Sequence, residues 1–61
     1  MNYGLRKQAS LHIEQLMRSE GKTLYSYNTI YNGLKWDPLT ESYHFFAMDD
    51  TYSFSKTDMA L

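Results

Sequence analysis

The sequence predicts an α+β fold, with one N-terminal amphipathic helix packed on a three-stranded antiparallel β-meander. Two observations lead to this prediction. Residues 3–19 repeat apolar side chains at the spacing of a helix. After Thr23 the composition shifts to tyrosine, threonine, phenylalanine and asparagine, and two turn-like segments divide that part into strand-length pieces. The expected order is helix, strand, strand, strand, within a single small domain over residues 1–61.

The helix expected over residues 3–19 has an apolar stripe and recognisable ends. Asn2 suits an N-cap, and Gly21 suits the left-handed conformation that often follows a last helical turn. His12 lies at the edge of the stripe. Leu11 falls on the polar side, where it is either an ordinary exposed leucine or a contact with a partner or a neighbouring segment. The stripe consists of Leu5, Ala9, Ile13, Leu16 and Met17.

Two turns are expected between the strands. In WDPLTES, Asp37 followed by Pro38 suits the first two positions of a turn and predicts a loop over residues 38–41. In MDDT, Asp49 and Asp50 suit a two-residue hairpin loop, because aspartate tolerates positive φ better than most residues.

These loops fix a register in which Trp36 faces Tyr43 and Phe45 faces both Leu34 and Phe54. The face beneath the helix would then hold Ile30, Leu34, Trp36, Tyr43, Phe45, Ala47, Tyr52 and Phe54. The second face would hold Tyr31, Gly33, Lys35, His44, Phe46, Met48, Thr51, Ser53 and Ser55. Because neighbouring strand residues point to opposite faces, Phe45 is expected in the core, and Phe46 is expected on the second face, opposite Gly33.

Two segments leave alternatives open. Residues 23–29, TLYSYNT, are open to three interpretations. They either extend the first strand, or form a loop that folds back over the second face, or begin a second helix capped by Ser26. The helix has poor propensity because of its β-branched residues, asparagines and glycine. At the end of the chain, Ser55 and Asp58 resemble a helix start, but few residues follow. Either this end is a frayed or docked tail, or the chain was cut from something longer. The absence of a visible tag and the initial methionine favour a complete small protein.

Composition narrows the class of protein. The chain has 61 residues, no cysteine and a net charge of −1. Residues 1–35 carry five basic and two acidic side chains, whereas residues 36–61 carry one basic and five acidic. This weak dipole is far from the basic stripe of a nucleic-acid-binding protein. The sequence has no apolar run long enough to span a membrane, no signal peptide and no cysteine. The expected location is therefore the cytoplasm.

Little catalytic chemistry is visible in the sequence. It contains no glycine-rich phosphate loop, paired catalytic signature or metal-ligand cluster, so we expect no enzyme, cofactor, metal or small-molecule substrate. His12 and His44 are too few to hold a structural zinc without cysteine ligands. His44 is expected at the surface or an interface, as a histidine that can titrate near neutral pH.

The surplus of aromatic side chains points to a protein partner. Tyrosine and methionine are enriched at protein interfaces, whereas charged residues are depleted from interface centres. The expected partner-binding residues are Leu11, Tyr31, His44, Phe46 and Met48. The sequence thus predicts a non-enzymatic protein-binding module, an inhibitor or adaptor that docks an aromatic sheet face on a partner or on itself. Size alone suggests an accessory protein of the phage or mobile-element type.

Nucleic-acid binding is the alternative. An aromatic sheet face suits single strands, but only Lys35 would add positive charge there. A winged-helix transcriptional regulator would use residues 3–19 and 26–34 as helices and residues 42–55 as the wing. The acidic residues Asp49 and Asp50 in that wing would repel phosphate, which disfavours this function.

Overall fold

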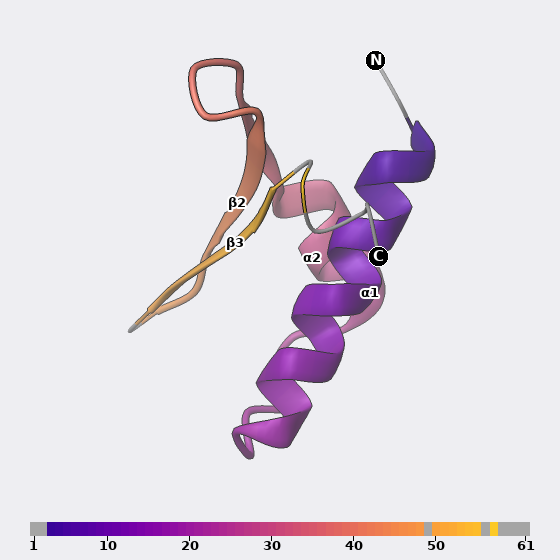
Figure 1. The fold of residues 1–61 in the computed structure, drawn as a ribbon. Helices are drawn as coiled ribbons and strands as arrows, with labels where there is room; N and C mark the ends of the chain where they lie inside the picture. The colour runs from indigo at the N-terminus through magenta and orange to yellow at the C-terminus, as the bar shows by residue number, and fades with distance from the viewer. Residues whose placement is uncertain (1–2, 49, 56, 58–61) are drawn as a thin grey trace.

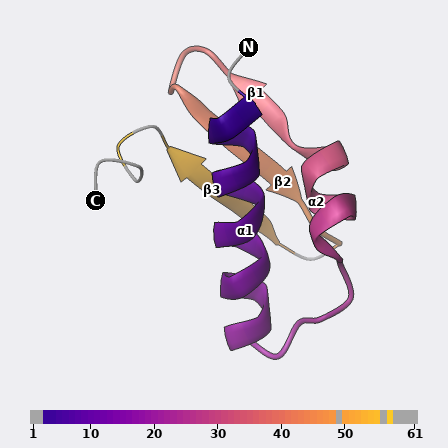
Figure 2. The same cartoon turned by 90° about the vertical axis from the view of Figure 1, so that its right-hand side faces the viewer.

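The computed structural model describes residues 3–48, 50–55 and 57. The described elements are α1 (Tyr3–Ser19), α2 (Tyr27–Gly33), β1 (Lys35–Asp37), β2 (Ser42–Phe46) and β3 (Thr51–Ser55). The strands form an antiparallel sheet in the order β1-β2-β3, and α1 and α2 lie side by side against one face of it (Figures 1 and 2). The predicted α+β fold with a helix on a β-meander is confirmed, and α2 is added to it.

Helix α1 buries its stripe against the sheet as expected. Ala9 and Ile13 are fully buried, and Leu5 and Met17 nearly so. Gly21 has φ of 77°, and the Lys22 N–H donates a 2.8 Å hydrogen bond to the Met17 carbonyl, which closes the last turn. Leu16 departs from the prediction, because its side chain is 39 % exposed on a flank of the helix. The expected cap, Asn2, lies outside the described residues.

Residues 23–29 lead into and begin α2, so they neither extend the first strand nor cover the second sheet face. Ser26 is the N-cap, and its Oγ accepts a 3.3 Å hydrogen bond from the Thr29 N–H. Ile30 is fully buried, and the rings of Tyr25 and Phe45 pack in a T-shaped arrangement with 5.2 Å between centroids. Burial of these apolar side chains outweighs the weak helix propensity of the segment.

The β1–β2 pairing has the predicted register, with Trp36 opposite Tyr43 and a loop over residues 38–41. Two details were wrong. Strand β1 begins only at Lys35, so Gly33 ends α2 and packs against Phe45 instead of facing Phe46. Trp36 is 40 % exposed and is not a core residue, because it lies on a short edge strand. Its ring still packs on Tyr43, at 4.9 Å between centroids.

The β2–β3 hairpin has a longer loop than predicted. Phe45 faces Tyr52 instead of Phe54, because the loop spans residues 47–50 and the Ala47 N–H donates a 2.9 Å hydrogen bond to the Asp50 carbonyl. The register is therefore displaced by two residues. A two-residue shift leaves every strand side chain on its original face, so Phe45 is buried as predicted while Phe46 is 60 % exposed.

The face of the sheet turned away from the helices, called the outer face here, is covered by none of the elements described (Figure 1). Its strand residues are Lys35, Asp37, Ser42, His44, Phe46, Thr51, Ser53 and Ser55. Neither described helix is both long and apolar enough to cross a membrane. The predicted helix start at Ser55 and Asp58 lies largely outside the described residues.

Candidate functional site

A row of polar side chains crosses the outer face with His44 at its centre. The register places Lys35 and Ser53 on either side of His44 in the neighbouring strands. His44 Nδ1 lies 2.7 Å from Ser53 Oγ, and His44 Nε2 lies 3.5 Å from Asp37 Oδ2. His44 and Ser53 form a pair without backbone hydrogen bonds between them, and such pairs bring side chains closest together. The imidazole is thus held between a hydroxyl and a carboxylate.

Asp37 is fixed by its own turn. The Leu39 N–H donates a 3.0 Å hydrogen bond to Asp37 Oδ1. This bond lowers the pKa of the Asp37 carboxyl, partial desolvation opposes the shift, and hydrogen bonds from Thr40 and His44 add to the lowering. Asp37 therefore presents a negative charge to His44 at neutral pH, and the pair strengthens when His44 is protonated.

Serine, histidine and aspartate also make up nucleophilic triads, so their roles here can be compared. The contact of His44 with Ser53 has the length that proton transfer needs, but the Asp37 contact is longer than an orienting hydrogen bond. Oxyanion donors must point at the reacting atom, whereas strand N–H groups lie in the sheet plane, away from a substrate above the face. The row is best described as an exposed polar ladder that fixes the orientation of His44.

Of the five predicted partner-binding residues, the structure brings only His44 and Phe46 together. Their ring centroids lie 6.4 Å apart on the outer face. Tyr31 lies on α2 instead of the sheet, because residues 27–33 are helical. Leu11 is 48 % exposed on α1, and none of the described contacts joins it to the other four.

Tyr31 belongs to the helix layer through Arg6. The Arg6 guanidinium lies 5.0 Å from the centre of the Tyr31 ring and 5.7 Å from that of Tyr43, and it donates a 3.3 Å hydrogen bond to the Leu34 carbonyl. Since Tyr43 points to the core face, Tyr31 stands on the opposite side of the sheet from His44. Its role in this arrangement is to hold α2 to α1.

Met48 lies at a pocket between the end of α1 and the β2–β3 loop. The pocket has a volume of about 640 Å³. Leu24 and Met48, which line it, are 76 % and 88 % exposed, whereas Met17 at its inner wall is buried. Its lining is completed by Gly21, Lys22, Thr23, Tyr25 and Ala47. Exposed apolar side chains therefore adjoin a concave surface at this place.

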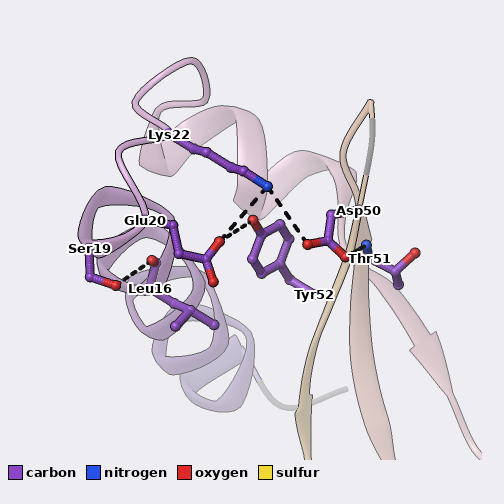
Figure 3. A network of polar contacts seen from close by, with 7 residues as sticks. All are labelled: Leu16, Ser19, Glu20, Lys22, Asp50, Thr51 and Tyr52. Carbon is purple, nitrogen blue, oxygen red and sulfur yellow. Dashed lines mark hydrogen bonds and ion pairs between the residues drawn. The ribbon is translucent and has the colours of Figure 1, made fainter.

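Lys22, which lines the pocket, is paired with two carboxylates (Figure 3). Lys22 Nζ lies 3.9 Å from Glu20 Oε1 and 3.7 Å from Asp50 Oδ2. The Tyr52 hydroxyl donates a 2.7 Å hydrogen bond to the same Glu20 oxygen, and this bond raises the pKa of Tyr52, together with desolvation. Two carboxylates and one ammonium give the margin of the pocket a net negative charge.

The described residues contain no group of three or more histidine, cysteine or acidic side chains placed to hold a metal ion. No protein-family model, curated protein or solved structure matches the chain.

The sequence indicated some of these groups and missed others. The sequence does not identify Leu24 and Tyr25 as pocket residues, because it leaves the conformation of residues 23–29 undecided. The signal that could have pointed to a binding surface is Leu24 itself, an isolated leucine in a polar stretch. The contact of His44 with Ser53 was hidden by the two-residue register error, which placed Ser55 opposite His44. Met48 was placed on the outer face because the strand pattern was extended into the loop.

Proposed function

We propose that this chain is a non-enzymatic protein-binding module that receives an apolar side chain of a partner protein in the pocket between α1 and the β2–β3 loop. The observation behind this proposal is the position of Leu24 and Met48, two highly exposed apolar side chains, around a pocket of about 640 Å³. Methionine adapts its shape to different apolar groups, so Met17 and Met48 suit a surface that accepts a partner side chain.

The charge beside the pocket indicates the chemistry of the partner. Glu20 and Asp50 outnumber Lys22, so a segment with lysine or arginine next to its apolar anchor is favoured over an acidic one. If this chain occupies a basic site on a larger protein, it would act as an inhibitor or adaptor of that protein, in the manner of a phage-type accessory protein. A cysteine-free chain suits a reducing compartment, and the cytoplasm is the location that we propose.

The test uses two synthetic amphipathic peptides, one combining leucine with lysine and one combining leucine with glutamate. Methyl NMR of Met17 and Met48 reports binding at the pocket. We expect the lysine peptide to shift both methyl signals and to bind about tenfold more tightly than the glutamate peptide. The variants Leu24→Ser and Met48→Ser change exposed side chains, so each should fold normally and weaken binding about tenfold.

Phe46→Ser is the matched control, since it removes an exposed apolar side chain from the outer face instead of the pocket. It should leave peptide affinity unchanged. If Phe46→Ser abolishes binding while Met48→Ser does not, the outer face is the docking surface and the pocket proposal is wrong. The proposal also fails if neither peptide binds while an apolar dye occupies the pocket.

A DNA-binding regulator is the second candidate, and the specific observation in its favour is α2. A second helix beside α1 is what the winged-helix alternative requires, and α2 exposes Asn28 and Asn32. The helix has no charged residue, so phosphate contacts would have to come from other segments. Fluorescence anisotropy of a labelled, mixed-sequence DNA duplex tests this function. The duplex should bind at low salt, and its affinity should fall steeply as salt is added. If the anisotropy of the duplex does not change on adding the protein at low salt, this function is ruled out.

A further inference from the structure

In the part of the chain that the structure describes, no strand pairs with the side of β3 turned away from β2. The bond from the Ala47 N–H to the Asp50 carbonyl sets the alternation of the ladder, so Tyr52 and Phe54 direct their backbone groups toward β2. The N–H and C=O of Ser53 must then point away from β2, in the plane of the sheet. Thr51 points the same way, and its N–H is already bonded to Asp50 Oδ1 at 2.8 Å. Ser53 is thus the centre of the open edge.

Strand β3 itself carries little protection against pairing, although the Asp50 carboxylate occupies the N–H at its Thr51 end. Monomeric proteins commonly place lysine, proline or a bulge on an edge strand, because its open backbone groups otherwise recruit another strand. Strand β3 reads TYSFS, with neither charge nor proline, and its ladder with β2 is regular from Thr51 to Ser55. The opposite edge strand, β1, is shorter and carries Lys35 and Asp37.

The flank of α1 above this edge also carries no lysine, arginine or carboxylate. His12 identifies that flank, because its ring centroid lies 5.0 Å from that of Phe54 on β3. Counting about 100° per residue, the exposed side chains that share this flank are Gln8, His12, Gln15, Leu16 and Ser19. His12 is the one titratable side chain among these five, and Leu16 is 39 % exposed there. In Figure 2 this flank lies on the β3 side of α1, away from α2.

We propose that a second copy of this chain pairs with the β3 edge, across a two-fold axis that passes beside Ser53. In this antiparallel pairing Ser53 faces the second copy's Ser53, and Thr51 faces the second copy's Ser55. The two copies form one continuous sheet with both helix layers on the same side. The neutral flanks of the two α1 helices then approach each other, which covers Leu16.

The choice of a second copy rests on charge and symmetry. A two-fold axis places equal surfaces against each other, so any charge near it meets its own like charge. The β3 side chains from Thr51 to Ser55 are uncharged, and the α1 flank carries no lysine, arginine or carboxylate, although acidic and basic residues occur elsewhere on α1. A partner of different sequence would gain from charges on this surface, whereas self-association favours their absence. The inference is independent of the proposed pocket, whose lining contains no residue of β3.

Single cysteine variants test the axis directly, because the chain has no cysteine of its own. In a hydrogen-bonded antiparallel pair the facing Cα atoms lie about 5.5 Å apart, which a disulfide can span. Ser53→Cys should therefore form a disulfide-linked dimer rapidly under mild oxidation. The matched control is Thr51→Cys, where the two cysteines would lie about 14 Å apart along the strands, at about 3.4 Å per residue. We expect at least a tenfold slower linkage for the control.

Sedimentation of the unmodified chain provides the second readout. We expect a species of about 14 kDa, twice the 7.2 kDa chain, that dissociates on dilution. Ser53→Pro removes the outward N–H and should shift the protein to monomer, since proline is tolerated on an open edge. Ser53→Ala loses only the bond to His44 and should remain a dimer.

Three results would each overturn the proposal: a monomer at every concentration, equal linkage of the two cysteine variants, or a dimer that a folded Ser53→Pro leaves intact. If Ser53→Pro does not fold, the comparison of the two cysteine variants still decides. Peptide binding at the Met48 pocket is measured separately, so failure of one proposal leaves the other open to its own test.

Discussion

The hydroxyl of Tyr52 donates a 2.7 Å hydrogen bond to Glu20 Oε1, which joins the middle of β3 to the residue after α1 (Figure 3). The contact links residues 32 positions apart in the sequence. Lys22 completes the arrangement, with its ammonium 5.8 Å from the centre of the Tyr52 ring. Lys22 also lines the Met48 pocket, so the stability of this corner affects the proposed binding surface.

The first prediction concerns alkaline pH. The bond to Glu20 raises the pKa of Tyr52 above its ordinary value of 10.0. The unfolded chain therefore loses its tyrosine proton at a lower pH than the folded chain. The contribution of Tyr52 to stability is complete below about pH 10 and declines as the pH rises beyond it. Urea unfolding between about pH 8 and pH 11 should show this decline.

Glu20→Gln is the control for the alkaline prediction, because it removes the carboxylate that accepts the bond. Its stability should fall less steeply above about pH 10 than that of the parent chain. The tyrosinate absorbance titration of the parent should contain a late component that Tyr52→Phe lacks. Identical alkaline profiles for the parent and Glu20→Gln would contradict the assignment.

The second prediction concerns acidic pH and the loop between β1 and β2. The Leu39 N–H keeps the pKa of Asp37 below its ordinary value of 3.8. The unfolded chain then takes up this proton first as the pH falls. The contribution of Asp37 to stability is therefore complete above about pH 4 and is lost as the pH drops through the lowered pKa.

Carboxyl NMR should show Asp37 titrating below its ordinary value of 3.8. Asp37→Asn keeps an acceptor for Leu39 but has no titrating group, so its stability should depend less on pH in the acidic range. An Asp37 resonance that titrates at or above its ordinary pKa would count against the turn as its cause.

The third prediction separates the two adjacent phenylalanines. Phe45 is 4 % exposed and packs on Tyr25, whereas Phe46 is 60 % exposed on the outer face. Phe45→Leu should lower the free energy of unfolding by about 1–2 kcal/mol, because it leaves a gap in the core. Phe46→Leu should change it by less than about 0.5 kcal/mol. Chemical denaturation of both variants tests this, and equal losses would mean that the outer face is covered.

The fourth prediction concerns Gly33 at the end of α2. A Cβ added at this position would lie 3.0 Å from Phe45 Cε1, and the buried Phe45 ring has little room to move. Gly33→Ala would gain about 1 kcal/mol of helix propensity but force this contact apart. We expect a net loss of about 1 kcal/mol, since overpacking a close contact costs more than the gain.

The double variant Gly33→Ala with Phe45→Leu removes the obstructing ring carbon and provides the control. Its stability should lie above the sum of the two single effects, which a double-mutant cycle measures. If Gly33→Ala instead raises the free energy of unfolding, the Phe45 ring moves aside at little cost and the prediction is wrong.

The sequence by itself determined which side chains lie in the core. The 3.6-residue spacing places Ile13 beneath α1, and strand alternation separates Phe45 from Phe46 whatever the length of the loop between β2 and β3. Asp37 and Pro38 were sufficient to predict the β1–β2 loop and its register, because that turn chemistry acts within a few residues.

Only the tertiary structure decided where segments without a local signal go. Residues 27–33 form a helix because Ile30 finds a buried site between α1 and the sheet, which no propensity within the segment reveals. Loop length then displaced the β2–β3 register by two residues, which moved Met48 into the loop and set Ser53 beside His44. A local pattern fixes the face on which a side chain lies. Contacts between distant segments fix its neighbours, and these neighbours make the pocket and the open edge.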